Sequence, residues 1–505
     1  MTGQGVRWTA EQVLALAPDA ASQRSGGKLA VPRPWSEAGS GDGALWGTCE
    51  GSGRTPYQTV VDLTGSSGPG YKCSCPSRKF PCKHALALLL LWAGGSEAVP
   101  AAVECPEWAG DWLRRRRERA VAREGAASSE TATGTGQAAD PAGARRRAER
   151  RHRAMLSGAT ELEQRLTDLL RRGLAGADQS GYAPWEEIAA RMVDAQAPGL
   201  ADRVRELGAL PASGAGWPER LLSECALLHL LSQGLLALGS PEGPEGAEGP
   251  EASEGGQSKP SRGEEPGSAH GPGAAGATTA RTPLPEPLAS TVRARVGLTI
   301  DTAKLLADGS AKQRDEWLVL AQRDTDEGKL TTRRIWMYGR RTRRPALLLS
   351  FGAAGSAPQL ALPVGSSAEI DLAFYPGGGP LRAALGSRHG DFTAAGVPEG
   401  AGGTVTDALA AYASALSTDP WLDGWPVVLR DVVPIPLDGG AWQLADADGD
   451  AALTVTTNSR ASGLWKLTAL SGGAPISVFG ECGHRGFAPY SAWHRSGQHP
   501  EVVPL

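Results

Sequence analysis

The stretch CSCPSRKFPCKH, residues 73–84, holds three cysteines and a histidine in a chain of 505 residues that has only seven cysteines. The possible ligands are spaced as Cys73, one residue, Cys75, six residues, Cys82, one residue, His84. Thiolates and imidazole are the usual ligands of structural zinc, and a closed tetrahedral site needs four of them. The stretch therefore predicts one structural zinc ion held by these four residues.

The surrounding sequence predicts a small ββα unit for this site. YQTVVDLT (57–64) and the segment 71–75 have the composition of strands, with a glycine-rich turn between them. Cys73 and Cys75 stand two residues apart and therefore share one side of the second strand. HALALLLLW (84–92) leaves the stretch as an apolar helix. Both ligand pairs can then face one ion.

Other interpretations of the cluster are weighed against structural zinc. Buried free cysteines with a stray histidine need no metal, but cysteine is scarce in the rest of the chain. A catalytic zinc needs an open coordination position and a nearby base, and no acidic residue lies between Cys73 and His84. A redox dithiol needs C-x-x-C, which the stretch lacks. Structural zinc is the favoured interpretation. The positive charges of Arg78, Lys79 and Lys83 offset the negative charge that the thiolates leave at such a site.

These residues resemble the SWIM-type zinc finger, in which C-x-C, a short spacer and C-x-H at a helix start follow two strands. CPSRKFPCKH (75–84) is typical of bacterial members, and ALWGTCEGSGRTPYQTVVDLTG (44–65) is similar to the family's lead-in. The resemblance implies zinc binding at Cys73, Cys75, Cys82 and His84. Such fingers accompany transposases, chromatin-remodelling ATPases and ubiquitin ligases and are thought to bind DNA or proteins. The resemblance therefore implies a DNA or a protein partner without selecting between them.

Length and composition indicate several domains joined by linkers. The length favours about three domains, and 67 Gly and 37 Pro indicate much turn or linker. The net charge of -4 gives no global reason to expect a nucleic-acid or membrane partner. No signal-peptide pattern is present, and no apolar run reaches the roughly 18 residues of a membrane helix. With an odd number of cysteines, these features predict a cytoplasmic chain with reduced thiols.

The predicted fold class is α+β and multidomain, with a small ββα zinc finger, a helical middle domain, a β-rich C-terminal domain and disordered linkers. Glutamates recur at every third position from Glu242 to Glu254, which indicates a solvated acidic spacer. The predicted boundaries are an N-terminal domain at 1–112 with the finger at about 44–93, a basic and partly disordered linker at 113–154, a helical domain at 155–238, a disordered acidic Gly/Pro/Glu linker at 239–284 and a β-rich domain at 285–505.

Local patterns predict particular elements inside these domains. Capping boxes begin helices at Thr9 and Thr160, because each threonine is followed three residues later by Gln or Glu. In the C-terminal part, apolar or β-branched stretches such as VRARVGLTI (292–300) and LWKLTAL (464–470) predict strands. One helix at about 405–416 interrupts them.

Three further patterns are assigned to structure rather than to function. DADGD (446–450) begins like a calcium loop but lacks its later Gly and Glu, so a turn between strands is predicted. Cys482 stands close to His484 without a second ligand pair nearby. Cys49 and Cys105 flank the finger at spacings that match no motif. All three cysteines are interpreted as packing residues.

The arginine runs allow two interpretations. Arg114–Arg117 and Arg145–Arg147 could form a phosphate-binding strip beside the finger, or a solvated helical face that needs no ligand. A second cluster of arginines lies around Trp336 and Tyr338 and allows the same two interpretations. It consists of Arg333, Arg334, Arg340, Arg341, Arg343 and Arg344. The candidate nucleic-acid residues are Arg78, Lys79, Lys83, Arg114, Arg115, Arg116 and Arg117.

The sequence contains no P-loop, no G-x-G-x-x-G after a strand, no H-E-x-x-H and no G-x-S-x-G. We therefore expect a non-enzymatic, zinc-binding protein that acts in DNA binding. The alternative is a protein-interaction scaffold, or an accessory subunit that docks through its finger. We expect one structural Zn²⁺ and a DNA or protein partner. We expect no membrane partner and no small-molecule substrate.

Overall fold

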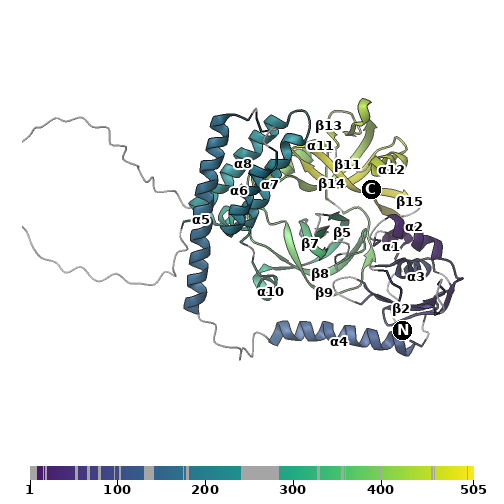
Figure 1. The fold of residues 1–505 in the computed structure, drawn as a ribbon. Coiled ribbons are helices and arrows are strands. Elements are labelled where there is room, and N and C mark those ends of the chain that lie inside the picture. The colour runs from purple at the N-terminus through teal and green to yellow at the C-terminus, as the bar shows by residue number, and fades with distance from the viewer. Residues whose placement is uncertain are drawn as a thin grey trace, which may run out of the picture. The chain divides into compact units, whose positions relative to one another are not determined.

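The chain folds into two compact units, Met1–Gly136 with Ile300–Leu505, and Gln137–Thr299. The computed structural model describes the chain apart from residues 1–7, 15, 18–19, 52–54, 65–68, 78–80, 96, 102–103, 130–140, 175, 178–180, 240–283, 299, 327–329, 354–357, 359, 399, 457–458, 460 and 497–498. The predicted acidic linker at 239–284 therefore lies outside the described residues, except at its two ends. Arg78 and Lys79 also lie outside them. The fold is mixed α+β, as predicted (Figure 1).

The finger is built on a four-stranded antiparallel sheet rather than on two strands. The strands follow chain order as β1 (Trp35–Gly41), β2 (Ala44–Cys49), β3 (Tyr57–Asp62) and β4 (Gly70–Cys73). The sequence signal for β1 is weak, because WSEAGSG is polar and glycine-rich and its register with β2 shifts between Ser36 and Gly39. The two predicted strands are present as β3 and β4.

The apolar helix α3 (Lys83–Ala93) packs between this sheet and two short helices, α1 (Ala10–Leu14) and α2 (Ala20–Leu29). It is buried on nearly every side, which explains its unbroken run of Leu and Ala. At Gly26 a Cβ would lie 2.9 Å from Leu86 Cβ, so α2 approaches α3 closely only because glycine stands there. The predicted capping box at Thr9 is confirmed, since its amide donates to Gln12 Oε1 (2.9 Å) and the Gln12 amide donates to Thr9 Oγ1 (3.2 Å).

Two six-stranded sheets form the C-terminal part, with strand orders β10-β8-β5-β6-β7-β9 and β13-β12-β11-β14-β15-β16. Their cores meet around Trp317, Trp336, Phe479 and Trp493. The strands are β5 (Lys312–Asp326), β6 (Leu330–Gly339), β7 (Pro345–Ala353), β8 (Ser366–Phe374), β9 (Arg382–Arg388), β10 (Thr393–Ala394), β11 (Trp425–Pro436), β12 (Trp442–Asp446), β13 (Ala452–Thr454), β14 (Ile476–Gly483), β15 (Gly486–Ser496) and β16 (His499–Pro504).

Three α-helices accompany these sheets in the described part of the chain: α10 (Thr302–Ala307), α11 (Val405–Leu416) and α12 (Ala461–Ser471). Helix α11 is confirmed, and it begins with a capping box between Thr404 and Asp407. The strand predicted at 464–470 is wrong, because that stretch lies in α12. The residues that α12 buries, among them Leu464, Leu467 and Ser471, recur at intervals of three and four, which is the helical period.

The second unit consists of helices: α5 (Pro141–Arg172), α6 (Ala183–Asp194), α7 (Pro198–Ala209), α8 (Trp217–Ala237) and α9 (Glu286–Arg295). The strand predicted at 292–300 is wrong, because its first half completes α9. Val292 and Val296 are both buried and stand four residues apart, a spacing that fits a strand and a helix equally well. Thr160 starts no helix: it lies inside α5, where its hydroxyl donates to the Leu156 carbonyl (3.0 Å).

The basic linker predicted at 113–154 is mostly helical where the structure describes it. Helix α4 (Glu107–Ser129) covers its first half, and α5 begins at Pro141. Arginine and alanine are strong helix formers, so a charged composition here does not oppose helix formation. None of the helices in the described ranges is long and apolar enough to cross a membrane.

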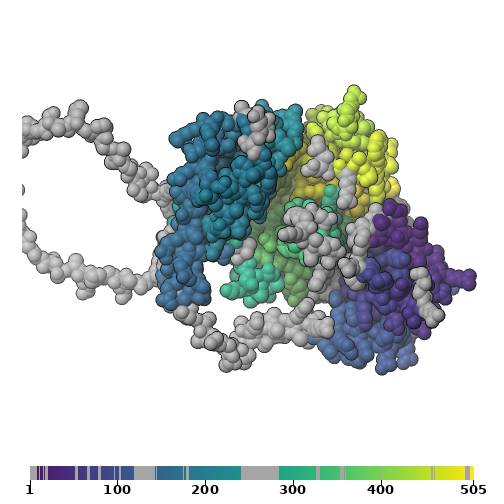
Figure 2. Space-filling model, in the orientation of Figure 1, coloured from purple at the N-terminus to yellow at the C-terminus, as the bar shows by residue number. Residues whose placement is uncertain are grey.

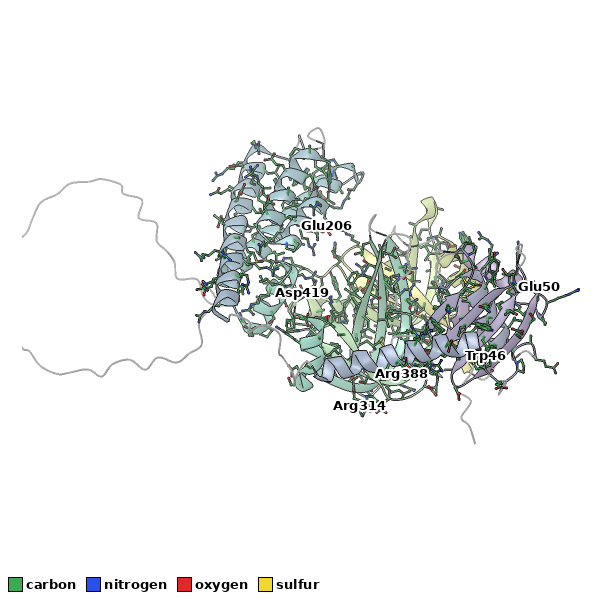
Figure 3. All side chains as sticks on the ribbon, turned by 60° about the horizontal axis from the view of Figure 1, so that its bottom comes forward. Trp46, Glu50, Glu206, Arg314, Arg388 and Asp419 are labelled. Atoms are coloured by element: carbon green, nitrogen blue, oxygen red, sulfur yellow. The ribbon has the colours of Figure 1, made fainter. Side chains whose placement is uncertain are left out.

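The finger packs against the C-terminal sheets within the first unit, where purple and green-to-yellow surfaces meet in Figure 2. Ala361 belongs to the hydrophobic core of the finger. Arg388 of β9, labelled in Figure 3, donates from Nη2 to the Thr64 carbonyl (3.3 Å). The finger is therefore an integral part of a larger unit.

Candidate metal centre

The structure brings Cys73, Cys75, Cys82 and His84 together at the junction of β4 and α3. Their ligand atoms all lie within 4.8 Å of one another, and Cys73 Sγ is 3.7 Å from His84 Nδ1. Tetrahedral zinc with Zn–S of about 2.3 Å and Zn–N of about 2.1 Å separates S and N ligands by roughly 3.6 Å. The donor set and its spacing fit one zinc ion.

Each ligand is positioned by a local feature of the chain. Cys73 is the last residue of β4, and Cys75 lies in the bend that follows. Cys82 is the N-cap of α3 in extended conformation (φ -73°, ψ 168°), so His84 follows in the first helical turn. Two ligands thus come from a strand end with the bend after it, and two from a helix start. The prediction that Cys75 shares the strand with Cys73 is wrong, because β4 ends at Cys73.

The surroundings of the ligands close the site on the protein side. His84 and Cys82 are buried, and the ring of Tyr57 lies 4.9 Å from the His84 ring. The hydroxyl of Thr59, a fully buried residue opposite Cys73 on β3, lies 3.2 Å from Cys73 Sγ. Such a contact orients the sulfur and stabilises its thiolate form.

The thiols do not ionise alike. Hydrogen bonds from Cys82, His84 and Thr59 hold the pKa of Cys73 well below its usual range, although burial opposes them. The hydrogen bond to the Cys73 sulfur and then burial raise the pKa of Cys82. Burial also raises the pKa of Cys75. Zinc binds thiolates, so its binding releases the protons that these cysteines still carry.

Two family models match this chain, the SWIM zinc finger over residues 57–93 and the SWIM-associated four-helix bundle domain over residues 150–248. The chain carries a SWIM zinc finger. The first match includes all four ligands, and the second covers most of α5 together with α6, α7 and α8. Searches of curated proteins and of solved structures gave no match. The SWIM finger and its Cys₃His cluster account for one zinc ion.

The α4 arginines predicted to bind nucleic acid are mostly engaged within the protein. Arg116 Nε lies 3.1 Å from Asp62 Oδ2, and Arg117 Nη2 lies 3.6 Å from Asp62 Oδ1. Asp62 is only 1% exposed, so these two arginines compensate a buried carboxylate and fasten α4 to β3. Arg114 pairs with Asp111. Arg115 is exposed and makes no ion pair or hydrogen bond with any residue that the structure describes.

Lys83 is the remaining predicted residue in the described part of the chain, and it is exposed at the start of α3. It lines a groove of about 480 Å³ beside the zinc ligands, together with Glu50 and Tyr57. Lys83 is thus part of the finger itself, whereas Arg116 and Arg117 of α4 contact the finger's sheet through Asp62.

The second arginine cluster is a structural network, not a stacking surface. Arg333 is 2% exposed and binds Asp324 through two hydrogen bonds of 2.7 Å. Trp336 is buried in the core between the sheets and offers no face to a base. Arg340 pairs with Glu316 and Arg341 with Asp315. Arg333, Arg340 and Arg341 therefore serve ion pairs within the protein, and Trp336 cannot stack on a base.

The minor motifs also have structural roles. Cys49 and Cys482 are fully buried, and Cys105 packs against the core around Trp46. DADGD is a turn between β12 and β13, as predicted, and Asp446 Oδ1 accepts from the Val405 amide (3.0 Å). Among the described residues, the Cys₃His cluster is the one group of three or more metal-binding side chains placed to share an ion.

One feature of the finger's surroundings was missed in the sequence. Lys72 of β4 and Trp108, Trp112 and Arg115 of α4 line a shallow cavity of about 340 Å³ with Asp111 and Arg116. The two tryptophans stand four residues apart in EWAGDWLRRRR, which places them on one helical face directly before the arginines. That spacing was the available signal, but the contribution of Lys72 depends on tertiary contact between α4 and the finger.

Proposed function

We propose that this protein binds nucleic acid, with DNA as its ligand, through the surface that α4 forms with β4 of the finger. The observation that carries the proposal is the cavity in which Trp108 and Trp112 stand beside Lys72 and Arg115. Indole faces stack on bases irrespective of sequence, and Lys and Arg bind phosphates. This combination supports binding of a single strand.

The charges at this surface favour an anionic ligand. Lys72 and Arg115 are exposed and have no ion-pair partner in the described part of the chain. The guanidinium carbon of Arg116 lies 5.7 Å from the centre of the Trp112 ring, while its Nε is held by Asp62. Arg116 therefore supports the tryptophan, which leaves Lys72 and Arg115 for the phosphates.

Zinc has a supporting role in this proposal. Lys72 immediately precedes the ligand Cys73, so the ion that orders the end of β4 also fixes the position of Lys72. The four-residue donor set leaves no open position for catalysis, which supports a non-enzymatic role. A cytoplasmic location remains part of the proposal.

The test is fluorescence anisotropy of zinc-loaded protein with labelled single- and double-stranded DNA over a salt series. We expect single-strand binding that weakens with salt, and Trp108→Ala with Trp112→Ala should weaken it at every salt concentration. Lys72→Gln with Arg115→Gln should lower the slope of log K against log[salt] by about 1.4. The matched control is Lys304→Gln with Lys312→Gln, two exposed lysines of the same unit. Absence of binding by the wild-type protein would overturn the proposal.

A second candidate is a docking module for a protein partner. The groove beside the zinc site favours it, because Tyr57, Leu29 and the oppositely charged Glu50 and Lys83 line it together. A mixed apolar and charged groove suits a peptide better than a phosphate backbone. Co-purification from native extract tests this candidate: a stoichiometric partner that Tyr57→Ala releases would support it.

A further inference from the structure

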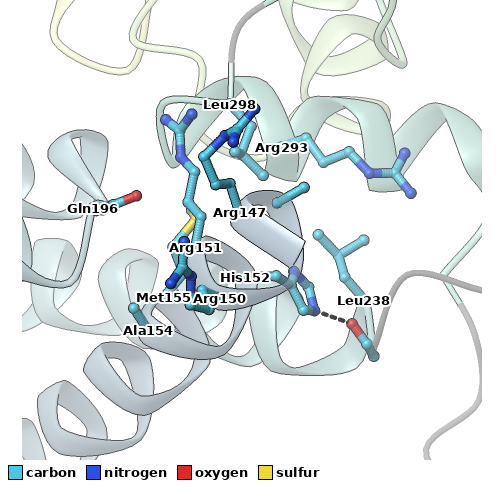
Figure 4. A pocket seen from close by; sticks show the side chains of 12 residues that line it. Arg147, Arg150, Arg151, His152, Ala154, Met155, Gln196, Leu238, Arg293 and Leu298 are labelled. Atoms are coloured by element: carbon cyan, nitrogen blue, oxygen red, sulfur yellow. Dashed lines mark hydrogen bonds between the residues drawn. The ribbon is translucent and has the colours of Figure 1, made fainter. Parts of the chain in front are cut away.

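We infer that a groove in the helical unit is a second nucleic-acid site, which binds the phosphates of a single strand. The groove has a volume of about 930 Å³ and lies where α5, the end of α8 and α9 meet (Figure 4). Its polar lining comes chiefly from Arg147, Arg150, Arg151, His152 and Arg293. The inference rests on the proposed function and assigns it a further site.

Three of these arginines carry no local compensation. Arg147, Arg150 and Arg151 are exposed and make no ion pair or hydrogen bond with any described residue. None of the described residues that line the groove is acidic, and the nearby Glu149 is paired with Arg145 instead. Like charges held together raise the free energy of the empty groove, and a bound polyanion relieves that repulsion.

The spacing of the arginines suits a chain of phosphates. Residues three and four apart share one face of a helix, so Arg147 lies one turn, about 5.4 Å, from Arg150 and Arg151. Across the groove, Arg293 of α9 adds a fourth guanidinium, although it is shared with Glu286 (2.8 Å). Guanidinium binds phosphate oxygens in a bidentate manner, which gives direction as well as charge.

The rest of the lining favours a nucleic acid over an acidic peptide. Met155, Leu238 and Leu298 give the groove an apolar part on which a base can rest. Gln196 adds an oxygen that can accept a hydrogen bond from a base edge (Figure 4). The φ of Gln196, 60°, belongs to the left-handed turn that ends α6, in which the Ala197 amide donates to the Met192 carbonyl (2.9 Å).

His152 fixes one wall of the groove. Its Nε2 donates to the Gly239 carbonyl at the end of α8, as the dashed line in Figure 4 shows. This bond connects the middle of α5 to the end of α8, so the arginines on either side of His152 are held on an ordered helix. The groove is thus preorganised, which lowers the entropic cost of binding.

The experiment uses the full chain, zinc-loaded, and a labelled single strand of about 16 nucleotides. The test variant is Arg147→Gln, Arg150→Gln, Arg151→Gln. The control is Arg153→Gln, Arg171→Gln, Arg172→Gln, which removes the same charge from exposed positions of the same helix outside the groove. Because all six side chains are exposed, circular dichroism should show both variants folded.

We expect the groove variant to bind at least about tenfold more weakly and to lose about 2 from the salt slope, as three lost phosphate contacts imply. The control should bind within about twofold of wild type. Equal losses in both variants, with wild type binding, would overturn the groove assignment alone. No binding by wild type would overturn the proposed function and the groove with it. If poly-glutamate of equal charge displaces the strand, the assignment of the groove to nucleic acid is overturned in favour of an acidic protein ligand.

Discussion

Two arginine-rich regions of this chain are alike in sequence and opposite in environment. In the hairpin of β5 and β6, Arg333 stands directly across from Asp324, and the two side chains form a bidentate pair in which Arg333 is buried and Asp324 is partly exposed. In α5, Arg147, Arg150 and Arg151 face a groove without acidic residues in the described lining. The first region uses its arginines to hold two strands together, and the second leaves them available to a ligand.

The difference teaches that the position of the carboxylates decides what an arginine run does. Strand β5 supplies Asp315, Glu316 and Asp324 within reach of the arginines on and after β6. Helix α4 is intermediate, because Asp62 of the finger engages Arg116 and Arg117 and leaves Arg115 without a partner in the described part of the chain. The hairpin, α4 and α5 all show the same dense positive charge in the sequence, so that density does not tell their roles apart.

Zinc is the strongest case of internal compensation, because one divalent cation neutralises thiolates that could not otherwise lie together. Removing the ion by chelation, or with Cys82→Ser, should unfold the finger, since structural zinc supplies about 10 kcal/mol of folding free energy in isolated fingers. Metal content and limited proteolysis of residues 35–93 are the measurements. The control is Cys482→Ser, a buried cysteine outside the cluster that should keep one zinc per chain. A Cys82→Ser protein that also keeps one zinc and resists proteolysis would refute the assigned ligand set.

The next largest effect is expected in the hairpin. Arg333→Met should destabilise the first unit by about 3 kcal/mol, because it leaves Asp324 without its partner and frees the carbonyls of Pro358 and Leu360. Its neighbour Arg334 is exposed, so Arg334→Met should change stability by less than about 0.5 kcal/mol. Urea unfolding of both variants makes the comparison. Equal stability of the two variants would mean that the pair of Arg333 with Asp324 contributes nothing net.

How far the sequence determines these outcomes depends on the range of the interaction. The zinc ligands lie within twelve residues and α11 begins with its own capping box, so both are predictable from local spacing. Asp62 and Arg116 are 54 positions apart, and nothing in the sequence indicates that they meet. The stretches 292–300 and 464–470 were misassigned because a short apolar spacing fits two periods until tertiary burial selects one. The groove of the helical unit combines four separate segments and could not be derived from any of them.

Lowering the pH should also distinguish the hairpin of β5 and β6 from helix α5. Asp315 is fully buried, and although burial raises the pKa of its carboxyl, hydrogen bonds from Thr342, Arg341 and Glu316 outweigh it and hold the pKa below its usual value. A lowered folded-state pKa means that its contribution to stability is present above the unfolded value of about 3.9 and is lost as pH falls through the folded value. Asp315→Asn should therefore lose stability at neutral pH and show a shallower decline below pH about 4. Parallel acid curves for variant and wild type would count against this role.

The smallest effect on stability is expected for the α5 arginines, and its sign is informative. Arg147→Gln, Arg150→Gln, Arg151→Gln removes no contact with a described residue, so the unfolding free energy should change by less than about 0.5 kcal/mol. Because the three guanidiniums repel one another, any shift should favour the variant at low salt and vanish as salt screens the charges. Thermal unfolding at low and high salt measures this. A loss of more than about 1 kcal/mol would place these arginines with those of the hairpin, as structural residues, and would remove the contrast from which the groove was inferred.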